Sequence, residues 1–155
     1  MYPTELENAT VITSRQKVVL SDVVFDVGEI GSRFFAELRD GPRIMGVRCP
    51  VCLKIYVPPR PTCAGCFEPL SDWVEVSPEG TLLASTTVYA PVANPPAEPP
   101  YTLAVVRLDG ADTGIVHLVD EVDPARLTEG TRVRAVFREA REGNIRDIEH
   151  FEITG

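Results

Sequence analysis

The four cysteines of this 155-residue chain stand in two tight pairs, Cys49-x2-Cys52 and Cys63-x2-Cys66, and the chain has no other cysteine. A C-x2-C turn places two sulfurs beside one metal ion, and a tetrahedral site made of thiolates alone needs four sulfurs at about 2.3 Å from the metal. The spacing therefore predicts one structural zinc site in a zinc ribbon, with all four cysteines as ligands. Four thiolates fill the tetrahedron, which leaves no open position for catalysis.

Two disulfides or a redox-active C-x2-C pair are the alternatives for the same four residues. Residues 1–5 lack the basic and apolar regions of a signal peptide, so we expect a cytoplasmic protein, and disulfides are rare in the reducing cytosol. A redox pair stands at the start of a helix, whereas Cys49 is followed by Pro50 and then by the extended pattern of residues 54–58. Both alternatives fit less well than zinc.

Composition narrows the class of protein. With 44% hydrophobic residues, the chain can bury one modest core and carry a metal-stabilised appendage. No apolar run is long enough to cross a bilayer, so we expect no membrane partner. The net charge is −8, and 13 of the 15 basic residues are arginine.

The sequence divides into four segments: an N-terminal arm (1–27), an amphipathic helix (28–42), a zinc ribbon (43–76) and a barrel domain (77–155). The helix is predicted from apolar residues at helical spacing, and Gly41-Pro42 ends it. A single helix ahead of a ribbon has little core to enter, so its apolar face is a candidate partner-binding surface, with ordinary core contact as the alternative. The residues of this face are Ile30, Phe34, Phe35 and Leu38.

The segment after Gly80 reads as all-β. Five strands of this size favour a five-stranded OB-fold barrel, and a short helix is expected over residues 123–127. The proline-rich residues 91–100 form either a stiff connection or a preshaped flap. The expected strands are 81–89, 101–108, 114–119, 132–138 and 145–153.

The chain offers no catalytic constellation that we can identify. No cysteine remains for acyl transfer, and His117 and His150 each lie in a strand pattern without a serine or carboxylate at a telling spacing. We therefore predict no catalytic residues and read each histidine as a barrel or surface residue.

Residues 28–151 resemble the family of accessory proteins of acyl-CoA enzymes that join a rubredoxin-like zinc ribbon to an OB-fold. The most specific likeness is the Pro58-Pro59-Arg60 held between the cysteine pairs, which a generic ribbon does not require. The remaining motifs are Phe34-Phe35, Val57 and Pro61 beside that tripeptide, Trp73-Val74-x-Val76, Gly80-Thr81-Leu82, Pro100-Tyr101-Thr102-Leu103-Ala104-Val105-Val106-x-Leu108 and Gly130-x2-Val133-x-Ala135-x-Phe137.

The resemblance implies a mainly β fold and a non-catalytic subunit. Members of this family accompany thiolase-like condensing or cleaving enzymes, one of them a benzoylsuccinyl-CoA thiolase, and help to bind the CoA ester or to hold the assembly together. The expected partner is therefore a thiolase-like catalytic subunit, with two copies of each chain as the natural assembly. The CoA ester would lie at or near the shared interface.

Two other functions compete with this one. A stand-alone acyl-CoA-binding protein would need cations for the CoA phosphates, and Arg43, Arg48, Lys54 and Arg60 are the candidates, with Arg60 favoured and ordinary solvated charge as the alternative. Zinc ribbons and OB-folds also bind nucleic acids. From Glu79 onward, however, thirteen carboxylates face seven arginines, so we expect no nucleic-acid partner.

Overall fold

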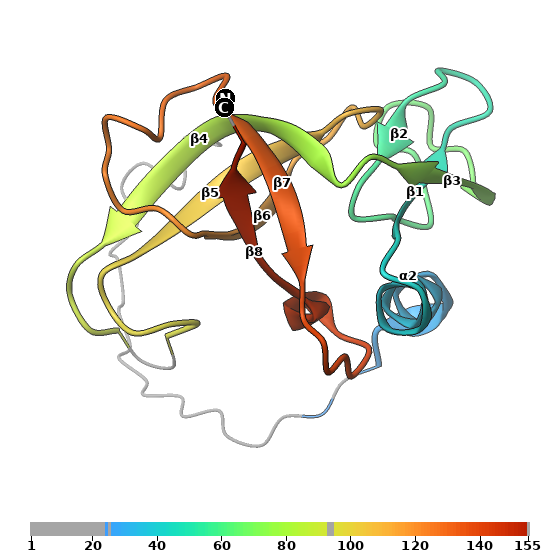
Figure 1. Ribbon diagram of the computed structural model, residues 1–155. Helices are drawn as coiled ribbons and strands as arrows, with labels where there is room; N and C mark the ends of the chain where they lie inside the picture. Colours follow the sequence, from blue (N-terminus) through green and yellow to red (C-terminus); the bar gives the residue numbers. More distant parts are fainter. Residues whose placement is uncertain (1–23, 25, 93–94, 155) are drawn as a thin grey trace, which may run out of the picture.

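The computed structural model describes residue 24 and residues 26–92 and 95–154. The predicted N-terminal arm (1–27) lies almost entirely outside these described residues. Figure 1 shows a β-barrel with a small three-stranded sheet and a helix beside it. The predicted fold class, mainly β with a short helix, a cysteine-bearing ribbon and a five-stranded OB-fold barrel, is confirmed.

The helix α2 (Gly28–Asp40) exists because apolar side chains recur on one of its faces while Glu29, Arg33 and Arg39 face solvent. Phe34 and Leu38 are its buried residues. The Asp26 carboxylate accepts a hydrogen bond of 2.7 Å from the Gly28 N–H just before the first turn. At the other end, Gly41 leaves the helix in an extended conformation, as the sequence predicts.

The ribbon sheet has the strand order β2-β1-β3, formed by β1 (Ile44–Arg48), β2 (Ile55–Tyr56) and β3 (Asp72–Val76). All pairs are antiparallel, and Val47 of the central strand stands opposite both Tyr56 and Trp73. The two cysteine turns extend from this sheet. Because β2 has only two residues and lies at the edge, the sheet needs support from outside itself.

The barrel closes in the order β4-β5-β6-β8-β7, the strand arrangement of an OB-fold. Its strands are β4 (Glu79–Val88), β5 (Tyr101–Leu108), β6 (Ile115–Val119), β7 (Arg132–Phe137) and β8 (Ile148–Ile153). At Gly80 the first strand pairs with both neighbours, opposite Leu108 and Val133. A Cβ at Gly80 would lie 2.4 Å from the Arg107 carbonyl oxygen, so only glycine allows this close approach.

The barrel is weakest between β6 and β8, which share a single parallel residue pair, Val119 with Phe151. The 3-10 turn η1 (Ile145–Asp147) directly precedes β8. His117 bridges it with a side-chain hydrogen bond, because its Nε2 lies 3.1 Å from the Ile145 carbonyl oxygen. His117 is therefore a buried structural residue of the barrel, in line with its place in a strand pattern.

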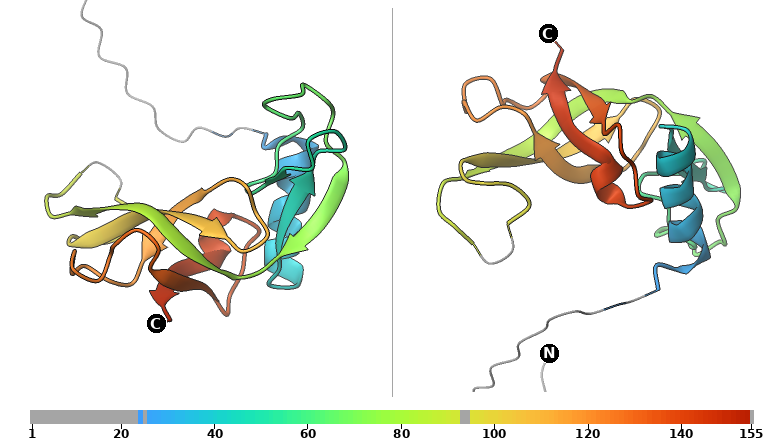
Figure 2. Two further views of the ribbon diagram at one scale, coloured as in Figure 1. Left: turned by 90° about the horizontal axis from the view of Figure 1, so that it is seen from above. Right: turned by 60° about the horizontal axis from the view of Figure 1, so that its bottom comes forward.

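One apolar core runs through the helix, the base of the ribbon and the barrel. Phe34 and Leu38 of α2 belong to the same buried cluster as Val106, Ile148 and Phe151. Figure 2 shows why: α2 lies beside the barrel, next to η1, rather than ahead of the ribbon alone. The expectation that the helix has little core to enter is therefore wrong, since α2 packs on both the ribbon and the barrel.

Two side chains of the β5–β6 turn fasten the ribbon to the barrel. The Asp112 carboxylate accepts a 2.8 Å hydrogen bond from the Ile55 N–H, and the Asp112 N–H donates to the Ile55 carbonyl at 2.9 Å. The Thr113 hydroxyl makes the same two kinds of bond with Val57. We call Asp112 and Thr113 together the clasp. The clasp gives the edge of the ribbon sheet, at Ile55 and Val57, the hydrogen bonds that a fourth strand would otherwise provide.

The segment 123–127, predicted as a helix, is a turn instead. It makes two short-range hydrogen bonds, from the Arg126 N–H to the Asp123 carbonyl and from the Leu127 N–H to the Pro124 carbonyl. The Asp123 carboxylate accepts from the Ala125 N–H, which favours a local turn over helix propagation.

The described residues contain no helix long and apolar enough to span a bilayer.

Candidate functional site

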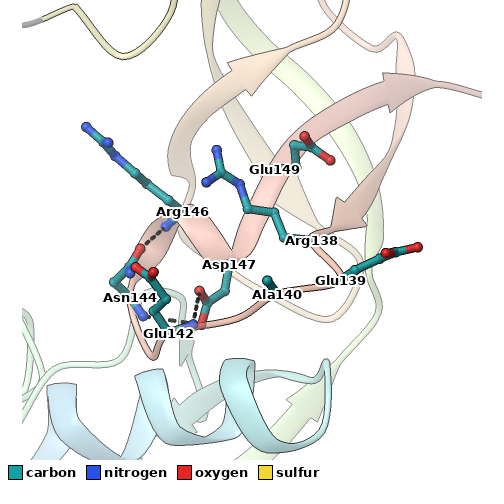
Figure 3. A pocket seen from close by; sticks show the side chains of 8 residues that line it. All are labelled: Arg138, Glu139, Ala140, Glu142, Asn144, Arg146, Asp147 and Glu149. Atoms are coloured by element: carbon teal, nitrogen blue, oxygen red, sulfur yellow. Dashed lines mark hydrogen bonds between the residues drawn. The ribbon is translucent and has the colours of Figure 1, made fainter.

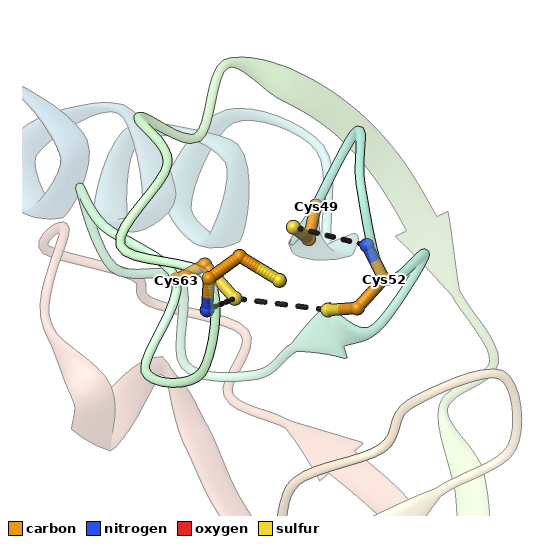
Figure 4. Close-up of side chains that lie close together, drawn as sticks. Cys49, Cys52 and Cys63 are labelled. Carbon is orange, nitrogen blue, oxygen red and sulfur yellow. Dashed lines mark hydrogen bonds between the residues drawn. The ribbon is translucent and has the colours of Figure 1, made fainter.

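The two cysteine turns bring four sulfur atoms together, all within 4.8 Å of one another. Figure 4 shows the turns facing each other across this cluster. The Sγ atoms of Cys52 and Cys63, from different turns, are 3.7 Å apart. A tetrahedron with metal–sulfur bonds of about 2.3 Å has edges of about 3.8 Å, so this distance fits two ligands of one ion. All four thiols are free in the structure, so it contains neither of the two disulfides that were the alternative for these cysteines.

The first turn is shaped for a metal. The Cys52 N–H points at the Cys49 sulfur at 3.5 Å, and the Leu53 N–H donates to the Cys49 carbonyl at 3.0 Å. Leu53 has a φ of 61°, in the left-handed region that closes such a turn. The Cys49 N–H in turn donates to the Lys54 carbonyl at 2.9 Å, which returns the chain to β2.

The second turn repeats this geometry residue for residue. The Cys66 N–H points at the Cys63 sulfur at 3.4 Å, and the Phe67 N–H donates to the Cys63 carbonyl at 3.1 Å. Phe67 has a φ of 59°, and the Cys63 N–H donates to the Glu68 carbonyl at 2.9 Å. Two matching turns that face each other form a preorganised site with four soft ligands, which suits zinc or a similar ion.

Burial within the cluster is uneven. Cys49 and Cys63 are buried, Cys66 is half-buried and Cys52 is exposed. The buried pair joins a small second core with Val47, Tyr56 and Leu70. This core is too small to hold the turns in place by itself, so a bound metal ion would supply much of the folding free energy of the ribbon.

The thiols differ in acidity because their neighbours differ. The Tyr56 hydroxyl, followed by the backbone N–H of Cys66, lowers the pKa of Cys63 to about 6. The adjacent Cys52 sulfur, followed by burial, raises the pKa of Cys66 to about 12. Once one thiol of the cluster has ionised, its negative charge makes ionisation of the next thiol less favourable. A divalent cation would offset this repulsion, because it stabilises all four thiolates at once.

Sequence reasoning missed Tyr56 as part of this site. Its hydroxyl lies 3.2 Å from the Cys63 sulfur and accepts a 3.3 Å hydrogen bond from the Ala64 N–H. The Arg60 guanidinium sits over the Tyr56 ring, 5.2 Å from its centroid. The signal in the sequence was a lone tyrosine in a strand four residues after Cys52, which by itself does not reveal which sulfur it reaches.

An apolar groove of about 440 Å³ runs between the helix and the ribbon. Phe35 and Gly31 line it from α2, and Pro58 and Pro59 line it from the segment between the cysteine pairs. Two features that the sequence singled out separately, the paired aromatics and the Pro58-Pro59 step, therefore meet at one surface. The other lining residues are Asp26, Val27, Phe34 and Ile145.

The four residues predicted for partner binding fall into two groups. Phe34 is 2% exposed and Leu38 is fully buried, so these two side chains mainly stabilise the core, and Phe34 also lines the inner side of the groove. Ile30 and Phe35 are half-buried and remain partly accessible. Of the predicted face, only the half with Ile30 and Phe35 is placed where a partner can touch it.

The four predicted CoA-binding cations are not equivalent either. Arg43 forms an ion pair with Glu37 of the helix, and Arg48 lies 3.5 Å from Asp72. Lys54 and Arg60 are exposed, and the described residues give neither of them an ion pair with a carboxylate. Among the described residues, no carboxylate therefore neutralises either cation, and the Arg60 guanidinium lies over the Tyr56 ring.

A polar hollow of about 670 Å³ opens at the loop between β7 and β8. Figure 3 shows that the Asp147 side chain turns back onto its own loop. The Asp147 carboxylate accepts hydrogen bonds from the N–H groups of Glu142, Gly143 and Asn144. The hydrogen-bonding capacity of this buried carboxylate is therefore used by its own loop, and Asp147 stabilises the loop conformation.

The outer face of the barrel between β4 and β6 is aliphatic. Leu103, Val105 and Val116 line a shallow apolar hollow of about 310 Å³ there, and Val116 is 61% exposed. An OB-fold that binds single-stranded nucleic acid presents aromatic and basic side chains on such a face. Of the described residues that line this hollow, none is aromatic or basic. This hollow therefore lacks the side chains with which such an OB-fold stacks bases and binds phosphates.

Comparison with known proteins gives one family match, one sequence relative and two solved structures. Residues 73–138 match the family described as the C-terminal OB-fold domain of ChsH2. A DUF35 domain-containing scaffold protein of Methanocaldococcus jannaschii is 25% identical over 111 residues, which cover 71% of this chain and 78% of that protein. Residues 73–138 are thus similar to the C-terminal OB-fold domain of ChsH2.

Two solved structures share the fold. The Ltp2-ChsH2(DUF35) aldolase superposes with a TM-score of 0.61 at 23% identity and covers 82% of this chain and 96% of that chain. A DUF35 family protein of unknown function from Sulfolobus solfataricus gives a TM-score of 0.57 at 22% identity, with coverage of 70% and 78%. At these identities the likeness extends to the fold alone.

Proposed function

We propose that this chain is a non-catalytic, zinc-binding accessory subunit of a thiolase-like enzyme that condenses or cleaves acyl-CoA esters. The observation that carries the proposal is the apolar groove between Phe35 and Pro58-Pro59, on a part of the molecule that is tied to both ribbon and barrel. The names of two similar proteins, a scaffold protein and an aldolase that contains ChsH2, support a role in an enzyme complex.

Zinc is the proposed ion of the four-cysteine site. The site offers only sulfur atoms as ligands, its Cys52–Cys63 sulfur distance fits a tetrahedron, and its two turns match, which together favour a structural zinc ion over a catalytic one. Its role would be rigidity. The metal would fix both cysteine turns, and with them the Pro58-Pro59 wall of the groove and the edge strand that the clasp holds.

The catalytic subunit would dock in the groove. An aromatic residue in an apolar pocket is the usual anchor of a protein interface, and Phe35 is the half-buried aromatic residue at this surface. The acidic remainder of the molecule would stay in solvent. The nucleophile and the bases of the reaction would come from the partner, in an assembly with two copies of each chain.

The CoA ester would bind at or near the same interface. Lys54 and Arg60 are the cations best placed for its phosphates, because Arg43 and Arg48 already face carboxylates. Arg60 also follows the Pro58-Pro59 step, so a phosphate at Arg60 would lie beside the docked partner. The acyl group would then be recognised by the catalytic subunit.

The docking proposal is tested with a charge placed in the groove. Phe35→Glu should abolish binding to a co-expressed thiolase-like subunit from the same organism, while Ser32→Glu on the exposed side of α2 should leave binding unchanged. Binding is measured by light scattering on the purified mixture. Full binding by Phe35→Glu would show that the partner docks elsewhere.

A stand-alone acyl-CoA-binding protein is the second candidate, and the unpaired Lys54 and Arg60 favour it. Calorimetry with CoA on the isolated chain separates the two functions. Micromolar binding by a monomer, lost in Lys54→Gln and Arg60→Gln, would support the stand-alone function. No binding by the isolated chain, together with binding by the complex, would support the subunit.

A further inference from the structure

We propose that Tyr56 is a second-sphere donor of the metal site: its phenol hydroxyl donates a hydrogen bond to the Cys63 thiolate and slows the release of the metal ion. The inference rests on the proposed zinc site and adds a residue to it. The hydroxyl lies 3.2 Å from the Cys63 sulfur, inside a region where Tyr56 is only 4% exposed.

The direction of the hydrogen bond follows from its partners. The phenol oxygen accepts the Ala64 N–H at 3.3 Å, and this contact holds the oxygen in place. A metal-bound thiolate carries no proton, so it can only accept. The single proton of the phenol must therefore lie on the Cys63 side, where it makes a charge-assisted hydrogen bond.

The two matching cysteine turns provide an internal comparison. Tyr56 stands four residues after Cys52, and Leu70 stands at the same position after Cys66. Both are buried in the same small core, at 4% and 3% exposure. Because leucine fills this position in one half of the site, packing does not require a hydroxyl. The phenol hydroxyl is therefore present at only one of these two equivalent positions, where it contacts the Cys63 sulfur.

The surroundings strengthen the donor. The Arg60 guanidinium lies over the Tyr56 ring, 5.2 Å from the centroid, where a cation draws electron density from the ring face. Cys63 also receives the Cys66 N–H at 3.4 Å, so its thiolate has both a backbone and a side-chain donor. Hydrogen bonds to a metal-bound thiolate lower its charge and make it harder to protonate, which is the first step of ligand loss.

The test compares Tyr56→Phe with Tyr101→Phe in the full chain. Tyr101 is a tyrosine of similar burial in the barrel, so its variant controls for the loss of a phenol outside the site. After zinc loading, Tyr56→Phe should release zinc to an excess of a coloured chelator about 10-fold to 100-fold faster than the unchanged protein, as expected for loss of a second-sphere contact. Tyr101→Phe should match the unchanged protein.

The spectrum of the cobalt-substituted protein separates a hydrogen bond from packing. Loss of a donor raises the energy of the sulfur lone pair, so the sulfur-to-cobalt charge-transfer band of Tyr56→Phe should move to longer wavelength. An unmoved band would overturn the inference, even with faster zinc release, because packing alone would then explain the rate. Unchanged protein that takes up neither ion would count against the proposed zinc site instead.

Discussion

Thr113 and Val57, 56 residues apart in the sequence, share two hydrogen bonds: the Thr113 hydroxyl accepts from the Val57 N–H at 2.8 Å and donates to the Val57 carbonyl at 2.9 Å. Val57 is 1% exposed and directly precedes Pro58 of the groove. One side chain of the barrel therefore satisfies both backbone groups of a buried ribbon residue. The position of the groove depends on this contact.

Thr113→Val should lower the free energy of unfolding by about 1–3 kcal/mol, since it leaves two buried backbone groups without partners. Thr113→Ser keeps the hydroxyl and serves as the control. Urea unfolding monitored by the fluorescence of the single tryptophan, Trp73 in the ribbon, measures the change. Equal stability of the valine variant and the unchanged protein would show that the clasp adds nothing to the ribbon.

Asp147→Asn should destabilise the barrel by about 1.5–3 kcal/mol, because the carboxylate accepts three backbone N–H groups from residues 142–144 while being 2% exposed. The amide would direct N–H groups at some of these donors. Glu149→Gln removes a charge from an exposed residue of β8 and should change stability little. Thermal unfolding of the two variants distinguishes the buried carboxylate from a general charge effect.

His117 predicts a pH dependence of stability. Burial lowers the pKa of His117 below its ordinary value near 6.5, so the unfolded chain takes up a proton at a pH where the folded barrel does not. Stability should therefore fall as the pH drops below about 6.5 and rise again as the pH is raised. His117→Gln keeps a donor for the Ile145 carbonyl without the titration and should lose this dependence.

The measurement is the free energy of unfolding at pH 7.5 and pH 5.5 for the unchanged protein, His117→Gln and His150→Gln. The acid-induced loss should be smaller in His117→Gln than in the other two proteins. An identical loss in all three would assign the pH dependence to other groups, such as the cysteines as they lose a metal ion.

Cys63→Ser should abolish stoichiometric zinc binding and loosen residues 43–76, because Cys63 is a proposed zinc ligand and a member of the small ribbon core. Zinc content by mass spectrometry of the metal and hydrogen exchange of the ribbon amides measure these two effects. Thr62→Ser changes the exposed neighbour and should alter neither. A fully zinc-loaded Cys63→Ser protein with a protected ribbon would contradict the proposed site.

Local patterns made much of this molecule predictable. The cysteine spacing predicted the cluster of four sulfur atoms, and β-branched runs ended by glycine and proline predicted the barrel strands. The packing partner of the helix was not predictable from the sequence. An apolar face such as that of Phe34 and Leu38 has the same residue pattern whether it packs into the protein's own core or against a partner protein. Only the three-dimensional packing of α2 against both ribbon and barrel decides between them.

Long-range side-chain contacts could not be predicted from the sequence for a related reason. The clasp residues lie in a turn and Tyr56 lies in a strand. The residues next to them in the sequence do not indicate which distant backbone group or sulfur atom each side chain contacts. The segment 123–127 was mistaken for a helix because Asp123 and Pro124 suit a helix start and a turn equally well. Here the hydrogen bonds from the Asp123 carboxylate and carbonyl keep it a turn.

The most direct measurement of the proposed function is the mass and activity of the co-expressed pair, this chain with a thiolase-like subunit from the same organism. We predict a complex with a fixed ratio of the two chains, dependent on Phe35 and on the cysteine site, whose acyl-CoA condensing or cleaving activity is lost when the accessory chain is removed. The account would be contradicted if this chain stayed a monodisperse monomer in the presence of the catalytic subunit and the catalytic subunit were fully active on its own.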